Sequence, residues 1–390
     1  MTGCLYVSPL GLPAILADTR VTDGTVDPDE VTPGKIIREG RQYAHDTKRI
    51  CRKSFILSDR TAIAVSGEEQ VITEFIRYCM SEINEIDKSE NPIETISKIS
   101  NRFGGNQESR LSVIGSHIFL DGKTCAMNGS LTHDLPYLGR CNAIGSGSSA
   151  LMSEAIAGDS SIRRFSVAQQ ANVPAQILGF CSAVNAERIL HETNPIVQQE
   201  DWGHFLEYII YEHVSNKWIR QPGHLYIYAA GGLLEDGIIS IKLLPRFVVY
   251  DPGIKNGRIA ACAIDDFGLA KCEWILEDVS IEDQLEVDQS FSFWNGWFPS
   301  TVTLTTVVPS VDGNNSRSII QSLNPSEMGH LLFSLNENEA RLELDEAFES
   351  HFYRHLAETM GFFHVPFNSI EPDTRKQIAW PRGVTFNADN

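Results

Sequence analysis

Apolar and polar positions alternate along the first 250 residues in blocks that predict strands and helices in turn. Strands are predicted over 3–8, 12–19, 110–120, 123–129, 140–145, 224–230 and 238–250, with two more inside 47–66. Apolar stripes of helical period predict helices over 71–83, 92–103, 174–192 and 203–217. Two antiparallel strand groups, separated and flanked by helix pairs, predict an α+β fold with sheets inside and helices outside.

The ends of several predicted elements carry the residues expected there. Asn91 and Pro92 open the second predicted helix, and Gly104-Gly105 follows its last apolar residue. Asp121-Gly122 stands between two predicted strands and is a strong hairpin signal. Residues 21–46 are rich in Asp, Thr, Pro and Gly, so they predict a loop.

The pattern changes after Pro252. Residues 253–335 consist mostly of short β-like runs and polar loops, whereas an apolar stripe predicts an amphipathic helix over 339–360. We therefore divide the chain into a first domain over residues 1–250 and a C-terminal extension of mixed β and α structure over residues 251–390.

Charge and hydropathy narrow the possible partners. The 390-residue chain carries 32 basic and 51 acidic residues, which gives a formal net charge of −19. Such a surface repels phosphate backbones, so nucleic acid is not an expected partner. No apolar run approaches the roughly 20 residues of a membrane span, and no secretory signal pattern opens the chain. The composition predicts a cytoplasmic protein that does not bind a membrane.

The cysteines occur singly, with no C-x-x-C pair among them. They are Cys4, Cys51, Cys79, Cys125, Cys141, Cys181, Cys262 and Cys272. This spacing favours reduced, mostly buried thiols over zinc ligands or a disulfide framework. The sequence therefore predicts neither a bound metal ion nor a cofactor.

The start of the chain carries the most specific chemistry, because Thr2 directly follows the initiator methionine. If Met1 is removed, Thr2 carries a hydroxyl and a free α-amine on one residue, so a nucleophile and a base arrive together. An α-amine titrates near pH ~8, close enough to neutrality to accept the hydroxyl proton. The pattern predicts an N-terminal nucleophile.

Further residues lie where such a nucleophile needs them. Asp18 ends the second strand of the first predicted hairpin, which returns it beside residue 2. Lys48 or Arg49 starts the next predicted strand, and a cation there would lower the pKa of the α-amine. Gly67 follows a predicted strand and permits close backbone approach, so its N–H would bind an oxyanion.

In order and spacing, residues 2–250 resemble the proteasome β-subunit family of N-terminal nucleophile hydrolases. That family has an N-terminal threonine, an aspartate sixteen residues later, a lysine opening the next strand, and a glycine after the following strand. A G-S-G turn then precedes a later helix, and Gly145-Ser146-Gly147 matches it. The resemblance implies a four-layer αββα sandwich, threonine-type cleavage of peptide bonds, and support of the threonine amine by Ser146.

The resemblance also implies partners. It implies peptide or protein substrates and self-assembly into a homo-oligomer, either a ring or a related assembly. Residues 251–390 would then serve as an oligomer contact, a gate, or a docking module for a partner such as an unfoldase.

Two other functions are open on the same fold. Arg49 cannot exchange its proton, Lys48 lies one place earlier than the family pattern, and residues 215–218 lack the acid expected before a late strand. These departures favour a catalytically inactive assembly or interaction subunit. A third hypothesis is hydrolysis of a small-molecule amide. The threonine peptidase is the leading hypothesis.

Overall fold

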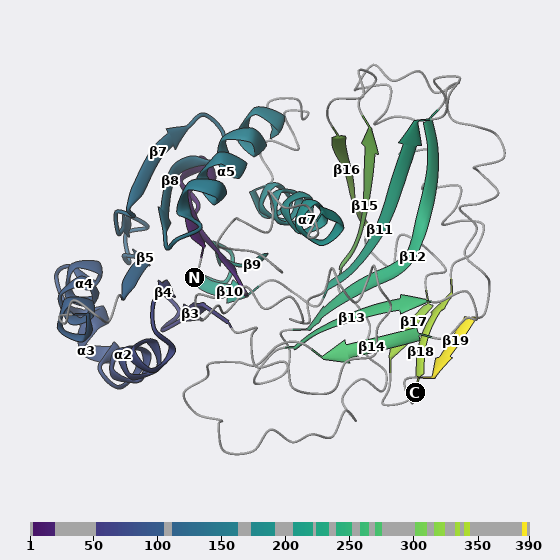
Figure 1. The fold of residues 1–390 in the computed structure, drawn as a ribbon. Helices are drawn as coiled ribbons and strands as arrows, with labels where there is room; N and C mark the ends of the chain where they lie inside the picture. The colour runs from purple at the N-terminus through teal and green to yellow at the C-terminus, as the bar shows by residue number, and fades with distance from the viewer. Residues whose placement is uncertain are drawn as a thin grey trace.

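The described residues form helices and largely antiparallel sheets (Figure 1). The computed structural model describes residues 3–19, 52–104, 111–162, 173–191, 206–220, 224–233, 239–251, 258–264, 270–274, 301–309, 316–323, 332–335, 339–343 and 384–387.

The chain begins in a six-stranded antiparallel sheet of order β10-β9-β2-β1-β8-β7. Its strands are β1 (Cys4–Val7), β2 (Ala14–Asp18), β7 (Leu131–Leu135), β8 (Gly139–Ile144), β9 (Leu206–Glu212) and β10 (Lys217–Arg220). The first two strands form a hairpin around the turn Pro9–Gly11, in which Gly11 has a φ of 80° that favours glycine. The predicted hairpin at the start of the chain is confirmed.

A four-stranded sheet of order β3-β4-β5-β6 packs on one face of the first sheet. It contains β3 (Ser54–Ile56), β4 (Thr61–Ser66), β5 (Ser112–Ile118) and β6 (Thr124–Ala126). One apolar cluster between the sheets joins Cys4, Tyr6, Ile15 and Ala17 of the first sheet to Ala62, Ala64, Ile114 and Ile118 of the second. Alternate strand residues point to opposite faces, so β1 and β2 supply this cluster with every second side chain.

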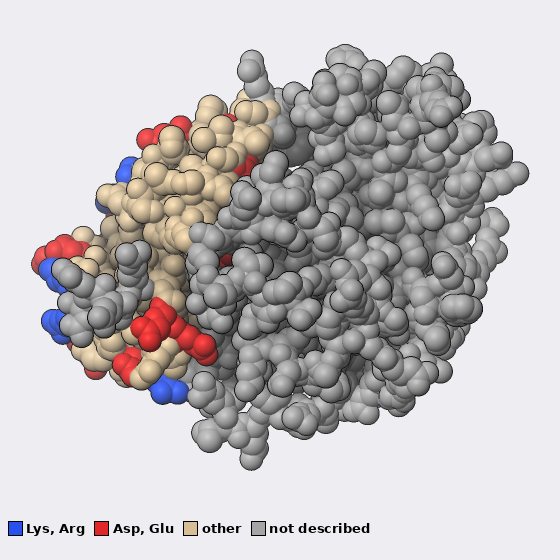
Figure 2. Space-filling view, in the orientation of Figure 1, with Lys and Arg blue, Asp and Glu red and all other residues tan. Residues whose placement is uncertain are grey.

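Helices α2 (Glu69–Ser81), α3 (Ile83–Lys88) and α4 (Pro92–Phe103) pack on the other face of the four-stranded sheet. Phe75 and Ile96 are fully buried in this cluster, which also contains Ile63 and Val65 of β4. The predicted start of α4 is confirmed, because Asn91 accepts a hydrogen bond from the backbone N–H of Glu94 at 3.2 Å. Some charged side chains of the described surface lie over these helices, and others lie near β7 and α5 (Figure 2).

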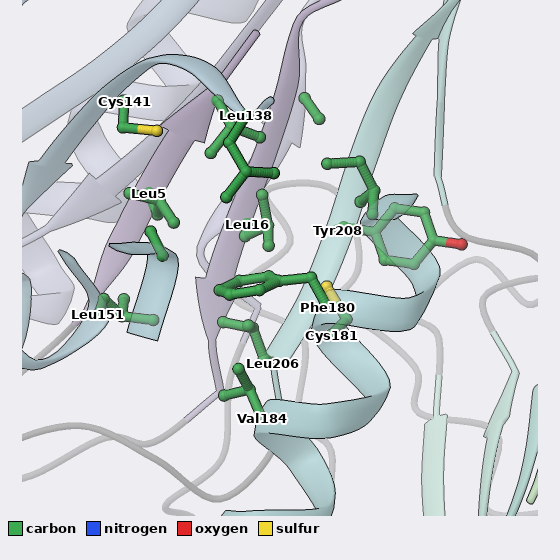
Figure 3. Packing of buried hydrophobic residues seen from close by; sticks show 14 of the residues in the cluster. Leu5, Leu16, Leu138, Cys141, Leu151, Phe180, Cys181, Val184, Leu206 and Tyr208 are labelled. Atoms are coloured by element: carbon green, nitrogen blue, oxygen red, sulfur yellow. The ribbon is translucent and has the colours of Figure 1, made fainter. Parts of the chain in front are cut away.

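Helices α5 (Ser148–Ile162) and α7 (Val173–His191) pack on the other face of the six-stranded sheet. Figure 3 shows Leu5 and Leu16 of the sheet facing Leu151, Phe180 and other apolar side chains of these helices. The predicted helix over 174–192 is therefore confirmed as α7, and α5 occupies a stretch for which the sequence pattern predicted no element.

A further six-stranded sheet joins strands on both sides of residue 250, in the order β14-β13-β12-β11-β15-β16. Its strands are β11 (His224–Leu233), β12 (Ile239–Asp251), β13 (Arg258–Ile264), β14 (Ala270–Trp274), β15 (Thr301–Pro309) and β16 (Ser316–Leu323). Only β11 and β15 pair in parallel in this sheet. A three-stranded sheet of order β17-β18-β19 contains β17 (Leu332–Leu335), β18 (Glu339–Glu343) and β19 (Val384–Asn387).

Two predicted helices are wrong where they fall on described residues. The stretch predicted as a helix over 203–217 contains strand β9, and the helix predicted over 339–360 begins with strand β18; residues 344–360 lie outside the described segments. Strand β9 is buried along almost its whole length, so its apolar residues do not alternate with polar ones. Without that alternation, the period of a buried strand cannot be told from that of a helix.

Candidate active site

The N-terminal end of strand β1 meets the C-terminal ends of β2 and β8. The backbone N–H of Asp18 donates to the carbonyl of Gly3 at 3.0 Å, and Cys4 pairs with both Ala17 and Ile144. The ends of β2 and β8 therefore lie beside the residue that directly follows Thr2 in the chain. Thr2 itself lies outside the described residues.

A buried ion pair lies at this end of the sheet. The ammonium of Lys53 donates to a carboxylate oxygen of Asp18, with an Nζ–Oδ1 distance of 2.5 Å. The side chains of Lys53 and Asp18 are 4% and 0% exposed. Both charges are thus removed from water. In the protein interior, a charge pair interacts more strongly than at the surface.

Lys53 is a candidate cation that the sequence pattern did not single out. The predictions placed the cation at Lys48 or Arg49 because they took the strand to begin near residue 47; both residues lie outside the described segments. The strand β3 begins at Ser54, directly after Lys53. A strand boundary drawn at the Arg52-Lys53 pair, where the polar run ends, would have identified Lys53.

Gly67 lies close to the same group of strands. It follows β4 and has a φ of 153°, a value that side chains rarely allow. Two residues earlier, the N–H of Val65 donates to the carbonyl of Lys53 at 3.0 Å, and the thiol of Cys4 donates to the carbonyl of Val65 at 3.6 Å. The end of β4 is therefore joined both to Lys53 and to β1.

Ser146 lies in the turn between β8 and α5. Gly145 has a φ of 89°, and its carbonyl accepts from the N–H of Ser148 at 3.2 Å. Ile144, the last residue of β8, pairs with Cys4, so this turn is at the same end of the sheet as Asp18. The structure thus gathers Asp18, Gly67 and the turn that carries Ser146 at one end of the two sheets and adds Lys53 to them.

A second group of buried charges adjoins Lys53. Glu207 of β9 is fully buried and binds three side chains, namely Arg52 (Nε–Oε2, 3.4 Å), Ser54 (Oγ–Oε1, 2.8 Å) and Arg220 (Nη1–Oε1, 3.1 Å). Arg220 also donates to the hydroxyl of Ser54 at 3.0 Å and to its carbonyl at 2.7 Å. The sequence pattern gave no sign of this group, because it placed Glu207 in a helix.

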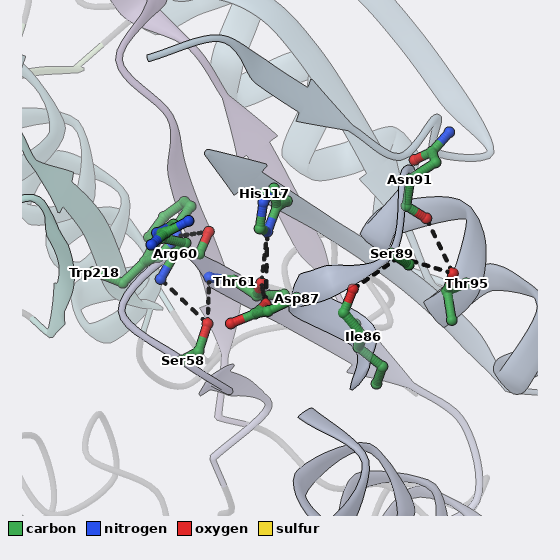
Figure 4. A network of polar contacts seen from close by, with 10 residues as sticks. All are labelled: Ser58, Arg60, Thr61, Ile86, Asp87, Ser89, Asn91, Thr95, His117 and Trp218. Carbon is green, nitrogen blue, oxygen red and sulfur yellow. Dashed lines mark hydrogen bonds and ion pairs between the residues drawn. The ribbon is translucent and has the colours of Figure 1, made fainter. Parts of the chain in front are cut away.

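A threonine and a histidine of the four-stranded sheet meet an aspartate of helix α3, as Figure 4 shows. The Thr61 hydroxyl donates to Oδ1 of Asp87 at 2.6 Å, and the Nδ1 atom of His117 lies 2.8 Å from Oγ1 of Thr61. Since the hydroxyl has one proton, His117 Nδ1–H must be the donor to Thr61. The imidazole therefore cannot accept the hydroxyl proton of Thr61, and this trio is not a nucleophile with its base.

The same trio adjoins a structural link between the two sheets. The backbone N–H of Trp218 donates to the carbonyl of Asp59 at 3.0 Å. Its indole Nε1–H donates to the carbonyl of Arg60, also at 3.0 Å (Figure 4). Burial lowers the pKa of His117, with the charge of nearby Asp87 opposing this shift. We therefore assign this trio to the stability of the fold.

Cys4, Cys79, Cys125, Cys141 and Cys181 are free thiols, and burial raises the pKa of Cys79 and of Cys141 to about 12. Among the residues that the structure describes, no group of three or more His, Cys, Asp and Glu side chains is arranged to hold a metal ion. Nor does any helix within the described segments have both the length and the apolar character needed to cross a membrane.

Neither the known protein-family models nor the curated proteins contain a match to this chain. The functional assignment therefore depends on the geometry of the site and on the sequence resemblance.

Proposed function

We propose that this chain is an N-terminal threonine hydrolase that cleaves peptide bonds, with Thr2 as its nucleophile after removal of Met1. The observation that carries the proposal is the buried Lys53–Asp18 ion pair, because Asp18 is also hydrogen-bonded to Gly3, the residue that follows Thr2. A buried cation and its counterion, next to the chain's first residues, are the groups that an α-amine needs to act as a base at neutral pH.

Lys53 takes the part that the sequence pattern had given to Lys48 or Arg49. It contacts Asp18, it directly precedes strand β3, and its carbonyl accepts from the next strand. It therefore meets the family requirement for a lysine that opens a strand. An ammonium can exchange its proton, which a guanidinium cannot.

In the proposed reaction, the Thr2 hydroxyl oxygen attacks the peptide carbonyl carbon while its proton passes to the Thr2 α-amine. The carbonyl electrons move to the oxygen, where the N–H of Gly67 would bind the resulting oxyanion. Collapse of this intermediate breaks the C–N bond, and the ammonium of Thr2 returns the proton to the leaving amine. Water, deprotonated by the same amine, then hydrolyses the ester and restores the hydroxyl.

The packing of the N-terminal elements supports the proposed αββα fold. Helices α5 and α7 pack on one face of the six-stranded sheet, whereas helices α2 to α4 pack on the four-stranded sheet that covers the other face. A cytoplasmic homo-oligomer with peptide or protein substrates, in which residues 251–390 contact another subunit or a partner, is part of the same proposal.

The test compares the full chain with its Thr2→Ala variant. We expect the mass of the purified protein to show loss of Met1, and we expect a panel of fluorogenic peptides to be cleaved by the wild type and not by the variant. A chain that retains Met1 and cleaves no peptide would support the inactive assembly subunit instead. Cleavage confined to small-molecule amides in a parallel panel would support the third hypothesis.

A further inference from the structure

The two residues that flank Lys53 in the chain, Arg52 and Ser54, are also polar or charged and buried. The Lys53–Asp18 contact does not explain why they are buried. Arg52 and Ser54 both bind the same carboxylate, Glu207, while Lys53 binds Asp18. In an extended segment, alternate side chains point to opposite sides. The two neighbours therefore hold this segment from one side and leave Lys53 to point to the other.

Strand β9 contacts both Asp18 and the segment that contains Lys53. Leu206 pairs with Asp18 across the sheet, and Glu207, the next residue, pairs with Ala17. The position of Leu206 is fixed in turn by Asn185, whose side chain accepts from its N–H at 2.6 Å and donates to its carbonyl at 3.1 Å. Two consecutive residues of β9 thus set the positions of Asp18 and of the segment that carries Lys53.

Arg220 of strand β10 also contacts this segment. It donates to Glu207, to the hydroxyl of Ser54 and to the carbonyl of Ser54, so it holds the main chain of this segment as well as a side chain. A guanidinium can do this because its donors are held in a planar fork, and an ammonium has no such geometry. The main-chain contact lies one residue from Lys53.

We propose that Glu207 and Arg220 are positioning residues that hold the Lys53 ammonium against Asp18 and, through it, beside the N-terminal amine. The second part of this inference rests on the proposed function, whereas the first does not. Lysine has a long flexible side chain, and a displacement of about 1 Å at a reacting group can lower a rate about a hundredfold. The contact of Arg220 with the main chain of Ser54 and that of Glu207 with the side chain of Arg52 limit that displacement.

The first experiment measures the position of Lys53 without using activity. The folded full chain is reductively methylated, and the modified fraction of Lys53 is read by peptide mass spectrometry. In the wild type the buried ammonium should be protected. We expect Glu207→Gln and Arg220→Lys each to raise the methylation rate of Lys53 about tenfold, since both keep side-chain size while weakening the charged contacts.

Two control variants separate positioning from general loosening of the fold. Glu85→Gln makes the same chemical change in an exposed carboxylate that pairs with Lys88, and Ile96→Val shortens a buried side chain of helix α4. Neither should alter the methylation of Lys53. If Glu207→Gln does not fold cooperatively, Ser54→Ala removes a single hydroxyl from the same group and is measured in its place.

The second experiment follows the modification rate of Thr2 by an electrophilic probe against pH. Glu207→Gln should lower the rate about tenfold at neutral pH and move the midpoint of the profile to higher pH, because a displaced cation no longer lowers the pKa of the amine. In a Lys53→Met background, Glu207→Gln should have little further effect, since a residue that acts through Lys53 is not additive with it.

The outcomes distinguish this inference from the proposed function. Unchanged protection of Lys53 in both Glu207→Gln and Arg220→Lys would overturn the positioning role whatever Thr2 does. Increased methylation of Lys53 in a chain whose Thr2 never reacts would support the positioning role and contradict the proposed hydrolase. Equal effects of Glu207→Gln with and without Lys53 would overturn the link to the N-terminal amine.

Discussion

The Lys53–Asp18 pair gives a sharp prediction about stability. Both side chains are almost completely buried, and their charged atoms are 2.5 Å apart. Removing one partner of a buried ion pair leaves the other charge buried without it, and this typically lowers the free energy of unfolding by about 3–5 kcal/mol. We therefore expect Asp18→Asn and Lys53→Met each to be destabilised by an amount in this range.

The double variant should behave differently. When both charges are replaced by neutral side chains of similar size, no charge is buried without its partner, so the double variant should be clearly more stable than the sum of the single losses predicts. The assay is urea denaturation followed by circular dichroism, with all four chains measured at one pH. Lys98→Met, which breaks an exposed pair with Glu94, serves as the control and should change stability little.

Additive losses in the double variant would contradict this reasoning, because they would mean that Asp18 and Lys53 do not interact in the folded chain. Losses no greater than that of the exposed control would contradict it as well, since they would indicate that water reaches the pair. In either case the proposed role of Lys53 at the N-terminal amine would lose its structural basis.

Other predictions test the core and the thiols. Phe75→Ala removes a fully buried ring between helices and sheet and should lower the free energy of unfolding by about 3–5 kcal/mol in the same assay. Cys79 and Cys141, with pKa values of about 12, should resist an aromatic disulfide reagent at pH 8 in the folded chain and react fully in denaturant; rapid reaction of the folded chain would refute this. Because burial lowers the pKa of His117, the unfolded chain takes up the proton first, so stability should decrease as the pH falls below about 6.5. His117→Asn should flatten that dependence in melts measured between pH 5 and 8; an unchanged slope would contradict it.

Local signals predicted much of the N-terminal fold. The apolar period of helices α2 and α4, the cap at Asn91 and the hairpin signal at Asp121-Gly122 depend on neighbouring residues, and the structure agrees with each. Asp18 and Gly67 were proposed as site residues because Asp18 ends a short, strongly apolar strand and Gly67 follows another, and the structure confirms those two positions in the fold. A residue at the end of a helix or strand can be predicted from the sequence whenever that helix or strand can be predicted.

The parts that could not be predicted depend on long-range contacts. Lys53 is a candidate site residue because it contacts Asp18, which lies on a strand distant in sequence. Glu207 was not singled out because the apolar pattern of its strand resembles that of a helix. Three separate segments supply Glu207, Arg220 and Ser54. Glu207 and Arg220 lie on the paired strands β9 and β10, whereas Ser54 lies on β3 of the other sheet, and no local pattern in the sequence relates it to them.

The proposed function requires Thr2 to be a nucleophile activated by its own amine beside Lys53. The most direct measurement is to incubate the full chain with a threonine-directed electrophile and to map the adduct by peptide mass spectrometry. We expect one adduct on Thr2 in a chain that has lost Met1, and an adduct rate at least tenfold lower in Lys53→Met. An active preparation in which Thr2 is never modified, or reacts equally fast without Lys53, would contradict it.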